Sequence, residues 1–188
     1  MKLQHTAATQ LDDDALWRHP YVRQAVDPRL RDDMRRLVAA VPEMLDRLNA
    51  LPQALPHGDG SPQNLLALKG EPRRFVAIDV AFQYPHAFGF DLGQLLVGLA
   101  HAGCLPVSAL PEIHEALVPA FVAGARDSGS DVSPDEVLLG YVGCLAIRSG
   151  VSSMPFELLG SPAASPELFA QRAALTRFVL DLWLDPTC

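Results

Sequence analysis

The sequence has few cysteines and no long apolar run, and each shortage excludes a class of protein. Its three cysteines, Cys104, Cys144 and Cys188, lie far apart and form no CxxC pair, which favours free thiols in a reducing compartment over a disulfide scaffold. No stretch approaches the roughly 18 unbroken apolar residues of a membrane span. Residues 1–14 are polar and acidic where a signal peptide needs an apolar core. These absences predict a cytoplasmic protein with no membrane segment.

Positive charge is also scarce. The formal net charge is −7 and the isoelectric point is about 5.2, which argues against binding to nucleic acids or anionic membranes, because both need basic patches. Nearly half of the residues, 49%, are hydrophobic and 20% are charged, so disorder is excluded. A chain of 188 residues is long enough to bury the core of one ordinary domain.

The order of apolar and polar residues predicts an α+β fold that is mainly helical, with a small β-hairpin in the middle. We expect a loose N-terminus over 1–14 and a single domain over 15–188. Strands are predicted for 65–69 and 74–79, joined by a hairpin connection over Gly70-Glu71-Pro72-Arg73. Pro42 is expected to break or kink the first long helix. Helices are predicted for 28–41, 44–51, 92–102, 111–126, 134–148 and 166–184, from apolar periodicity and from starts such as Ser165-Pro166.

The segment HGDGSPQN, residues 57–64, followed fifteen residues later by Asp79, carries the most chemical information. A loop with Asp59 and Asn64 five residues apart can direct a carboxylate and an amide oxygen to one point. The hairpin then returns a second carboxylate, Asp79, to the same end. Such hard oxygen ligands suit Mg²⁺ bound together with substrate phosphates, and phosphoryl transfer also needs a carboxylate to orient the attacking hydroxyl.

The order HGDxxPxN, hairpin, Ile78-Asp79 and then an Asp-Leu helix start at Asp91 resembles the aminoglycoside phosphotransferase and choline kinase-like family, which has a protein-kinase-like fold. The resemblance covers the C-terminal lobe, roughly residues 15–184. It implies that Asp59 is the catalytic base and that Asn64 and Asp79 are Mg²⁺ ligands. His57 and Gly58 would shape the loop, and Asp91 would support it through backbone hydrogen bonds. The implied cofactors are Mg²⁺ and ATP, and the implied substrate is a small molecule with a hydroxyl group.

The chain departs from the family in several places. Many relatives carry His where Ser61 stands and Trp where Val80 stands, which affects substrate positioning. The larger difference is the nucleotide-binding N-lobe, because the residues before His57 show neither a glycine loop nor a lysine on a strand. Lys2 and Lys69 are the only lysines, and neither fits that role, so no cofactor-binding residue is assigned.

Several interpretations stay open. The chain could be a fragment, one half of a split enzyme whose N-lobe is another polypeptide, or a non-catalytic module that binds a ligand or a protein on the same fold. Self-association or an N-lobe partner would use the exposed lobe interface. A metal-dependent hydrolase using the same acids is a third, weaker hypothesis. Asp59 and Asn64 could also be ordinary turn residues, Asp79 a strand-end cap and Asp91 a helix cap.

Overall fold

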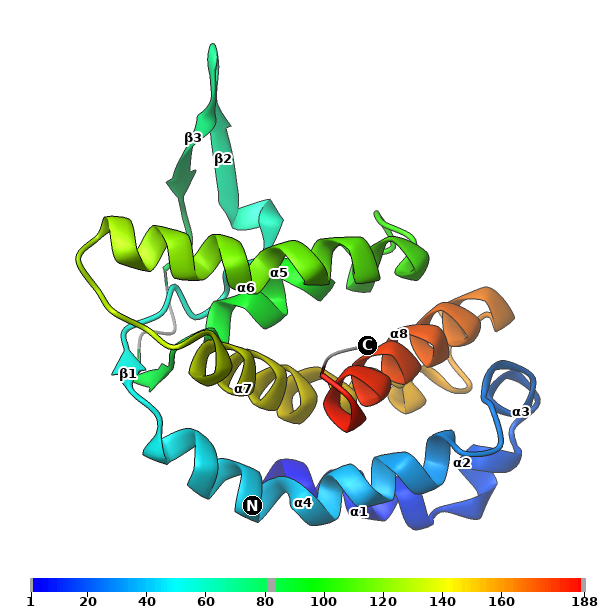
Figure 1. The fold of residues 1–188 in the computed structure, drawn as a ribbon. Helices are drawn as coiled ribbons and strands as arrows, with labels where there is room; N and C mark the ends of the chain where they lie inside the picture. Colours follow the sequence, from blue (N-terminus) through cyan, green and yellow to red (C-terminus); the bar gives the residue numbers. More distant parts are fainter. Residues whose placement is uncertain (1, 81–83, 187–188) are drawn as a thin grey trace. The chain divides into compact units, whose positions relative to one another are not determined.

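The computed structural model describes residues 2–80 and 84–186 and shows an α+β chain that is mainly helical (Figure 1). This confirms the predicted α+β, mainly helical class, and the kinase-like lobe stays a prediction. The described residues also form two antiparallel sheets of two strands each, β1–β4 and β2–β3. The helices are α1 Lys2–Asp12, α2 Asp14–Arg18, α3 Pro20–Ala25, α4 Leu30–Ala50, α5 Phe90–His101, α6 Leu110–Asp127, α7 Pro134–Leu145 and α8 Pro166–Leu184. The strands are β1 Gln53–Ala54, β2 Leu65–Leu68, β3 Glu71–Ala77 and β4 His86–Ala87.

The contacts within the chain group into two compact units. The first combines residues 1–45 with 145–188, and the second contains residues 46–144. Two such units can belong to one domain, so the expected single domain over 15–188 stays a prediction. None of the helices in the described ranges combines the length and apolar character needed to cross a bilayer.

The first unit is built on buried aromatic contacts and one partly buried ion pair. Trp17 of α2 packs against Phe156, with ring centroids 5.3 Å apart, and Tyr21 of α3 lies 6.2 Å from Phe169 of α8. Arg177 of α8 places its guanidinium 2.8 Å from the carboxylate of Asp33 on α4. These contacts join α3 and α4 to α8, and α2 to the short 3₁₀ turn Phe156–Leu158.

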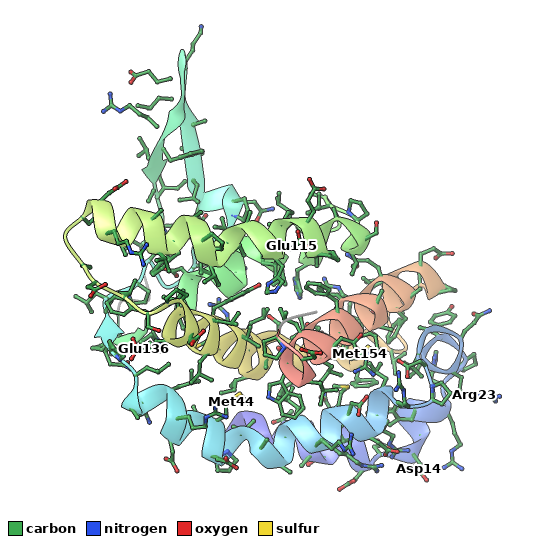
Figure 2. All side chains as sticks on the ribbon, in the orientation of Figure 1. Asp14, Arg23, Met44, Glu115, Glu136 and Met154 are labelled. Atoms are coloured by element: carbon green, nitrogen blue, oxygen red, sulfur yellow. The ribbon has the colours of Figure 1, made fainter. Side chains whose placement is uncertain are left out.

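The expected loose N-terminus is wrong, because residues 2–12 form helix α1 and Asp14 begins α2. Leu11 of α1 is buried. Its carbonyl, near the helix C-terminus, accepts hydrogen bonds from Arg31 Nε at 2.8 Å and Arg35 Nη2 at 3.1 Å. These two arginines satisfy a terminal carbonyl that a helix leaves unpaired. Asp14 also forms an ion pair with Arg31 at 2.8 Å, and Figure 2 labels its position at the start of α2.

Of the break or kink expected at Pro42, the break is absent, because α4 runs without interruption from Leu30 to Ala50. Pro42 lies on the exposed side of the helix. The heptad-like apolar pattern continues on both sides of it, and its members are buried: Leu30, Met34, Leu37, Val41, Met44 and Leu48. Burial of this stripe outweighs the roughly 3 kcal/mol that an interior proline costs a helix.

In the second unit the predicted hairpin is present, with β2 and β3 paired antiparallel. Leu65 lies opposite Ala77 and Leu66 opposite Val76, and an irregularity follows Ala67. The ribbon extends away from α5 and α6 (Figure 1). Helices α5 and α6 begin within two residues of their predicted starts.

Of the two remaining predicted helices, the one over 134–148 differs from the structure at its C-terminal end, and the one over 166–184 agrees with it at both ends. Helix α7 begins at Pro134 as expected but changes at Ala146 into a single π-helical turn, Ala146–Gly150, which contains the predicted last residue. Helix α8 begins at Pro166, and the hydroxyl of Ser165 accepts a hydrogen bond from the Leu168 amide at 3.1 Å. The Ser-Pro start therefore predicted this cap correctly.

Candidate functional site

The loop that contains HGDGSPQN is positioned by a short strand pair that sequence reasoning missed. Ala54 of β1 pairs with His86 of β4, and the Phe88 amide donates to the Pro52 carbonyl at 3.2 Å. Strand β1 directly precedes the loop and β4 directly precedes α5. Their pairing therefore brings the start of the loop next to the start of α5. Strands of two residues show no alternation of apolar and polar residues, so the sequence carries no clear signal for them.

Asp91, in the first turn of α5, accepts two hydrogen bonds from the loop. The His57 amide donates to Oδ2 at 2.6 Å and the Gly58 amide donates to Oδ1 at 2.9 Å. Both are hydrogen bonds to a charged acceptor, which are stronger than those between neutral groups. The carboxylate also lies at the N-terminal end of a helix, where negative charge is stabilised. Asp91 therefore restrains the backbone on the N-terminal side of Asp59.

The start of α5 is itself held in place by α7. Gly89 has a left-handed φ of 90°, and a Cβ atom at this position would lie 2.5 Å from the Val137 carbonyl. Tyr141, one turn further along α7, is fully buried and its hydroxyl lies 3.1 Å from His114 Nδ1. Burial raises the pKa of Tyr141 well above its ordinary value. This phenol therefore stays neutral and serves packing rather than proton transfer at neutral pH.

On the other side of Asp59, the loop closes through Asn64. The amide nitrogen Nδ2 of Asn64 donates to the Asp59 carbonyl at 2.9 Å and to Asp59 Oδ2 at 3.2 Å. A short 3₁₀ turn over Pro62–Asn64 brings the two residues together. Both side chains are half-buried. These bonds use the amide nitrogen of Asn64, so the amide oxygen is the atom left to act as a ligand.

Asp79 reaches this group through the backbone of the hairpin. The Ile78 amide donates to the Asn64 carbonyl at 3.0 Å, which extends the β2–β3 ladder by one pair beyond Leu65. Asp79 follows directly and is exposed. Its φ of 59° is the single left-handed value among the described non-glycine residues. Such conformations are uncommon outside glycine and collect at turns and functional sites.

The donor set suits a hard divalent cation in its chemistry. Asp59, Asn64 and Asp79 offer two carboxylates and one amide oxygen, the ligand types that Mg²⁺ prefers. Within the described residues, no group of three or more His, Cys, Asp or Glu side chains is arranged to hold a metal ion. The candidate set contains an asparagine and two acids, so it is not a group of that kind.

The loop also packs closely against α5 at Gly98, a residue that our sequence analysis did not single out. A Cβ atom on Gly98 would lie 2.7 Å from Ser61 Oγ and 3.4 Å from Pro62 Cδ. A glycine inside a helix costs about 1 kcal/mol relative to alanine, so its presence in the α5 sequence is the signal that could have indicated this contact. Ser61 is buried, and in the described part of the chain neither its Oγ nor His57 Nε2 has a hydrogen-bond partner.

The structure thus brings five of the six predicted residues together through side-chain or backbone hydrogen bonds: His57, Gly58, Asp59, Asn64 and Asp91. Asp79 directly follows Ile78, whose amide donates to the Asn64 carbonyl. Comparisons with protein-family models, with curated proteins and with solved structures found no match for this chain.

Proposed function

We propose that this chain is the C-terminal catalytic lobe of a small-molecule kinase similar to the aminoglycoside phosphotransferases and choline kinases. The reaction would transfer the γ-phosphoryl group of ATP to a hydroxyl group of the substrate. The observation that supports it most is the restraint of Asp59 from both sides, by Asp91 through the loop backbone and by Asn64 through its side chain. An ordinary surface turn does not need a carboxylate from another helix to hold it.

Asp59 is the proposed base, because a carboxylate held in one orientation can accept a hydrogen bond from the attacking hydroxyl and take up its proton. The Asn64 hydrogen bond to Oδ2 limits rotation of this carboxylate. His57 and Gly58 have no role in proton transfer in this proposal. They present backbone amides to Asp91 and so fix the loop.

Asn64 and Asp79 are the proposed Mg²⁺ ligands. Asn64 retains its amide oxygen for this purpose, and the exposed Asp79 carboxylate follows the hairpin pair that includes Asn64. When bound, Mg²⁺ would offset negative charge on the phosphate oxygens, and ATP would supply the phosphoryl group. No residue is assigned to hold the nucleotide, since Lys69 lies exposed at the turn of the hairpin, away from a helix N-terminus or glycine loop.

The alternative is a non-catalytic binding module on the same fold. The affinity for ATP, measured with and without an added nucleotide-binding lobe, distinguishes this module from a catalytic lobe. We expect the 188-residue chain to turn over ATP poorly or not at all by itself. Adding a nucleotide-binding lobe as a second polypeptide should raise ATP affinity and ADP release for the catalytic lobe of a split enzyme. A binding module should show neither change.

Mn²⁺ titration followed by electron paramagnetic resonance tests the metal site directly. We expect Asp79→Asn to weaken Mn²⁺ binding at least about tenfold, because a lost direct ligand costs no less than a lost outer-shell partner. Asp127→Asn, which changes an exposed acid at the end of α6, is the matched control and should leave binding unchanged. Equal Mn²⁺ affinity in the wild-type chain and both variants would refute the proposed site.

A further inference from the structure

The β2–β3 hairpin exposes apolar side chains on both of its faces. Leu66 is 48% exposed, Phe75 61%, Val76 43% and Ile78 41%. Figure 2 shows side chains projecting from both sides of this ribbon. Leu66 and Val76 form a cross-strand pair on one face, whereas Phe75 lies on the other. A sheet of two strands is marginal in water unless further strands or a helix add to it.

The long strand β3 also has an open edge among the described residues, since β2 is the one strand there that pairs with it. The Ile78 amide donates to the Asn64 carbonyl, so these two residues form a hydrogen-bonded pair. The same register continues along the ladder, with Leu66 opposite Val76. Hydrogen-bonded pairs alternate along an antiparallel ladder, so even-numbered residues of β3 point their amides toward β2. The amides and carbonyls of Phe75 and Ala77 therefore point away from β2, the strand with which β3 pairs in the described part of the chain. An apolar strand edge of this kind favours pairing with another chain.

Charge is distributed unevenly along the hairpin. The turn KGEPRR, residues 69–74, holds three basic residues and one acid, in a chain of net charge −7. At the opposite end of the hairpin lie the carboxylates of Asp59 and the exposed Asp79. Two copies of the hairpin placed side by side in antiparallel orientation would set the basic end of each beside the acidic end of the other. This charge arrangement fits a second copy of the same chain.

We propose that β3 pairs with β3 of a second copy about a two-fold axis at Val76, which makes a four-stranded antiparallel sheet. In this register Phe75, whose backbone amide and carbonyl point away from β2, lies opposite Ala77 of the partner subunit. A large side chain then lies beside a small one. It brings the two Val76 side chains together on the face that also carries Leu66. The contact is isologous, so it closes as a dimer and does not propagate into a filament.

Two neighbouring registers are less favourable. An axis at Phe75 would set Glu71 opposite the partner's Asp79, and like charges directly opposite destabilise a strand pair. An axis at Ala77 would require Asp79 to continue the extended strand, but its left-handed φ of 59° ends the extended backbone there. An axis at Val76 lets Phe75 and Ala77 both form hydrogen bonds across the interface. It avoids the pair of like charges and does not require Asp79 to be extended.

Sedimentation equilibrium over a wide concentration range tests the dimer. The wild-type chain should shift from 20.3 kDa toward twice that mass as its concentration rises. Val76→Glu should remain a monomer, because it sets two like charges face to face at the axis while leaving the side chain in water in the single chain. Leu184→Glu, an exposed leucine of similar exposure on α8, should dimerise as the wild type does. A wild-type mass of 20.3 kDa at every concentration would overturn the proposal.

Cysteine cross-linking tests the register independently of any loss of stability. The Cα atoms of residue 76 in the two copies would form a non-hydrogen-bonded pair about 4.5 Å apart, within the range of a disulfide. Residue 75 would be a diagonal neighbour of its own copy, about 8 Å away and too far to bridge. With Cys104 and Cys188 replaced by serine, mild oxidation should cross-link Val76→Cys and leave Phe75→Cys monomeric. Equal cross-linking of both variants, or none of either, would contradict the register.

The dimer does not depend on the proposed kinase chemistry. The sedimentation and cross-linking measurements read mass alone and need neither metal nor nucleotide. A chain that dimerises but fails to bind Mn²⁺ would retain this inference and lose the proposed function. A chain that binds Mn²⁺ but stays a monomer would keep the proposed function and lose the dimer.

Discussion

Replacing Asp91 with alanine should remove the support of the candidate loop. The substitution leaves the His57 and Gly58 amides without the carboxylate that now accepts from them at 2.6 and 2.9 Å. A hydrogen bond to a charged group contributes roughly 1.5–3 kcal/mol, and an unsatisfied buried donor costs about 1–3 kcal/mol. Gly58 is buried whereas Asp91 is half-buried, so water can compensate part of the loss. We therefore expect Asp91→Ala to lower the free energy of unfolding by about 2–4 kcal/mol.

Guanidinium chloride unfolding measures the size of this effect, and amide hydrogen exchange measures its location. The His57 and Gly58 amides should lose protection from hydrogen exchange in Asp91→Ala. In Asp91→Asn, both this protection and the free energy of unfolding should be intermediate, because the asparagine side chain keeps one acceptor oxygen. Asp135→Ala, which removes an exposed acid from the first turn of α7, controls for the loss of a helix-terminal charge. If the two alanine variants unfold alike, or if protection at His57 and Gly58 is unchanged, the carboxylate does not hold the loop.

Two further predictions concern the rest of the chain. Arg177→Met should lower the free energy of unfolding by about 2 kcal/mol, less than the roughly 3–5 kcal/mol of a fully broken buried pair, because it leaves Asp33, with 9% of its side chain exposed, with only the longer ion pair to the exposed Arg36 at 3.4 Å. A loss of less than about 0.5 kcal/mol in denaturant unfolding, typical of surface substitutions, would refute this. Burial raises the pKa of Cys144 from 9.0 to about 12, so iodoacetamide should modify this thiol in the folded chain far more slowly than after unfolding. The unfolded chain releases the thiol proton at the lower pH, so the stability that this group contributes is complete below pH 9 and is lost as pH rises toward 12. Cys144→Ala should flatten that part of the pH dependence, and an unchanged curve would contradict the assignment.

Signals carried by neighbouring residues predicted most of the fold. The Ser165-Pro166 start predicted both the first residue of α8 and its cap, and a turn at Gly70 between two apolar runs predicted the hairpin. These features depend on local backbone geometry, which a short window of sequence describes well.

The errors arose where distant residues decide the structure. Helix α1 is stabilised at its C-terminal end by Arg31 and Arg35, which lie 20 and 24 residues further along the chain than Leu11. Pro42 remains within α4 because the buried stripe continues past it, although its local preference is to end a helix. At α1 and at Pro42, tertiary contacts outweigh local propensity. The residues next to these two positions in the sequence do not indicate those contacts.

The candidate site combines both kinds of information. Asn64 is five residues from Asp59, so a loop motif can specify their hydrogen bond. Asp91 is 33 residues from Gly58, and it reaches the loop only because β1 pairs with β4 and α7 packs against Gly89. A segment with the same eight residues but without that carboxylate would have one restrained end and would behave as an ordinary turn. The identity of residue 91, together with the pairing that positions it, therefore decides whether Asp59 can serve as a base, and the motif by itself does not.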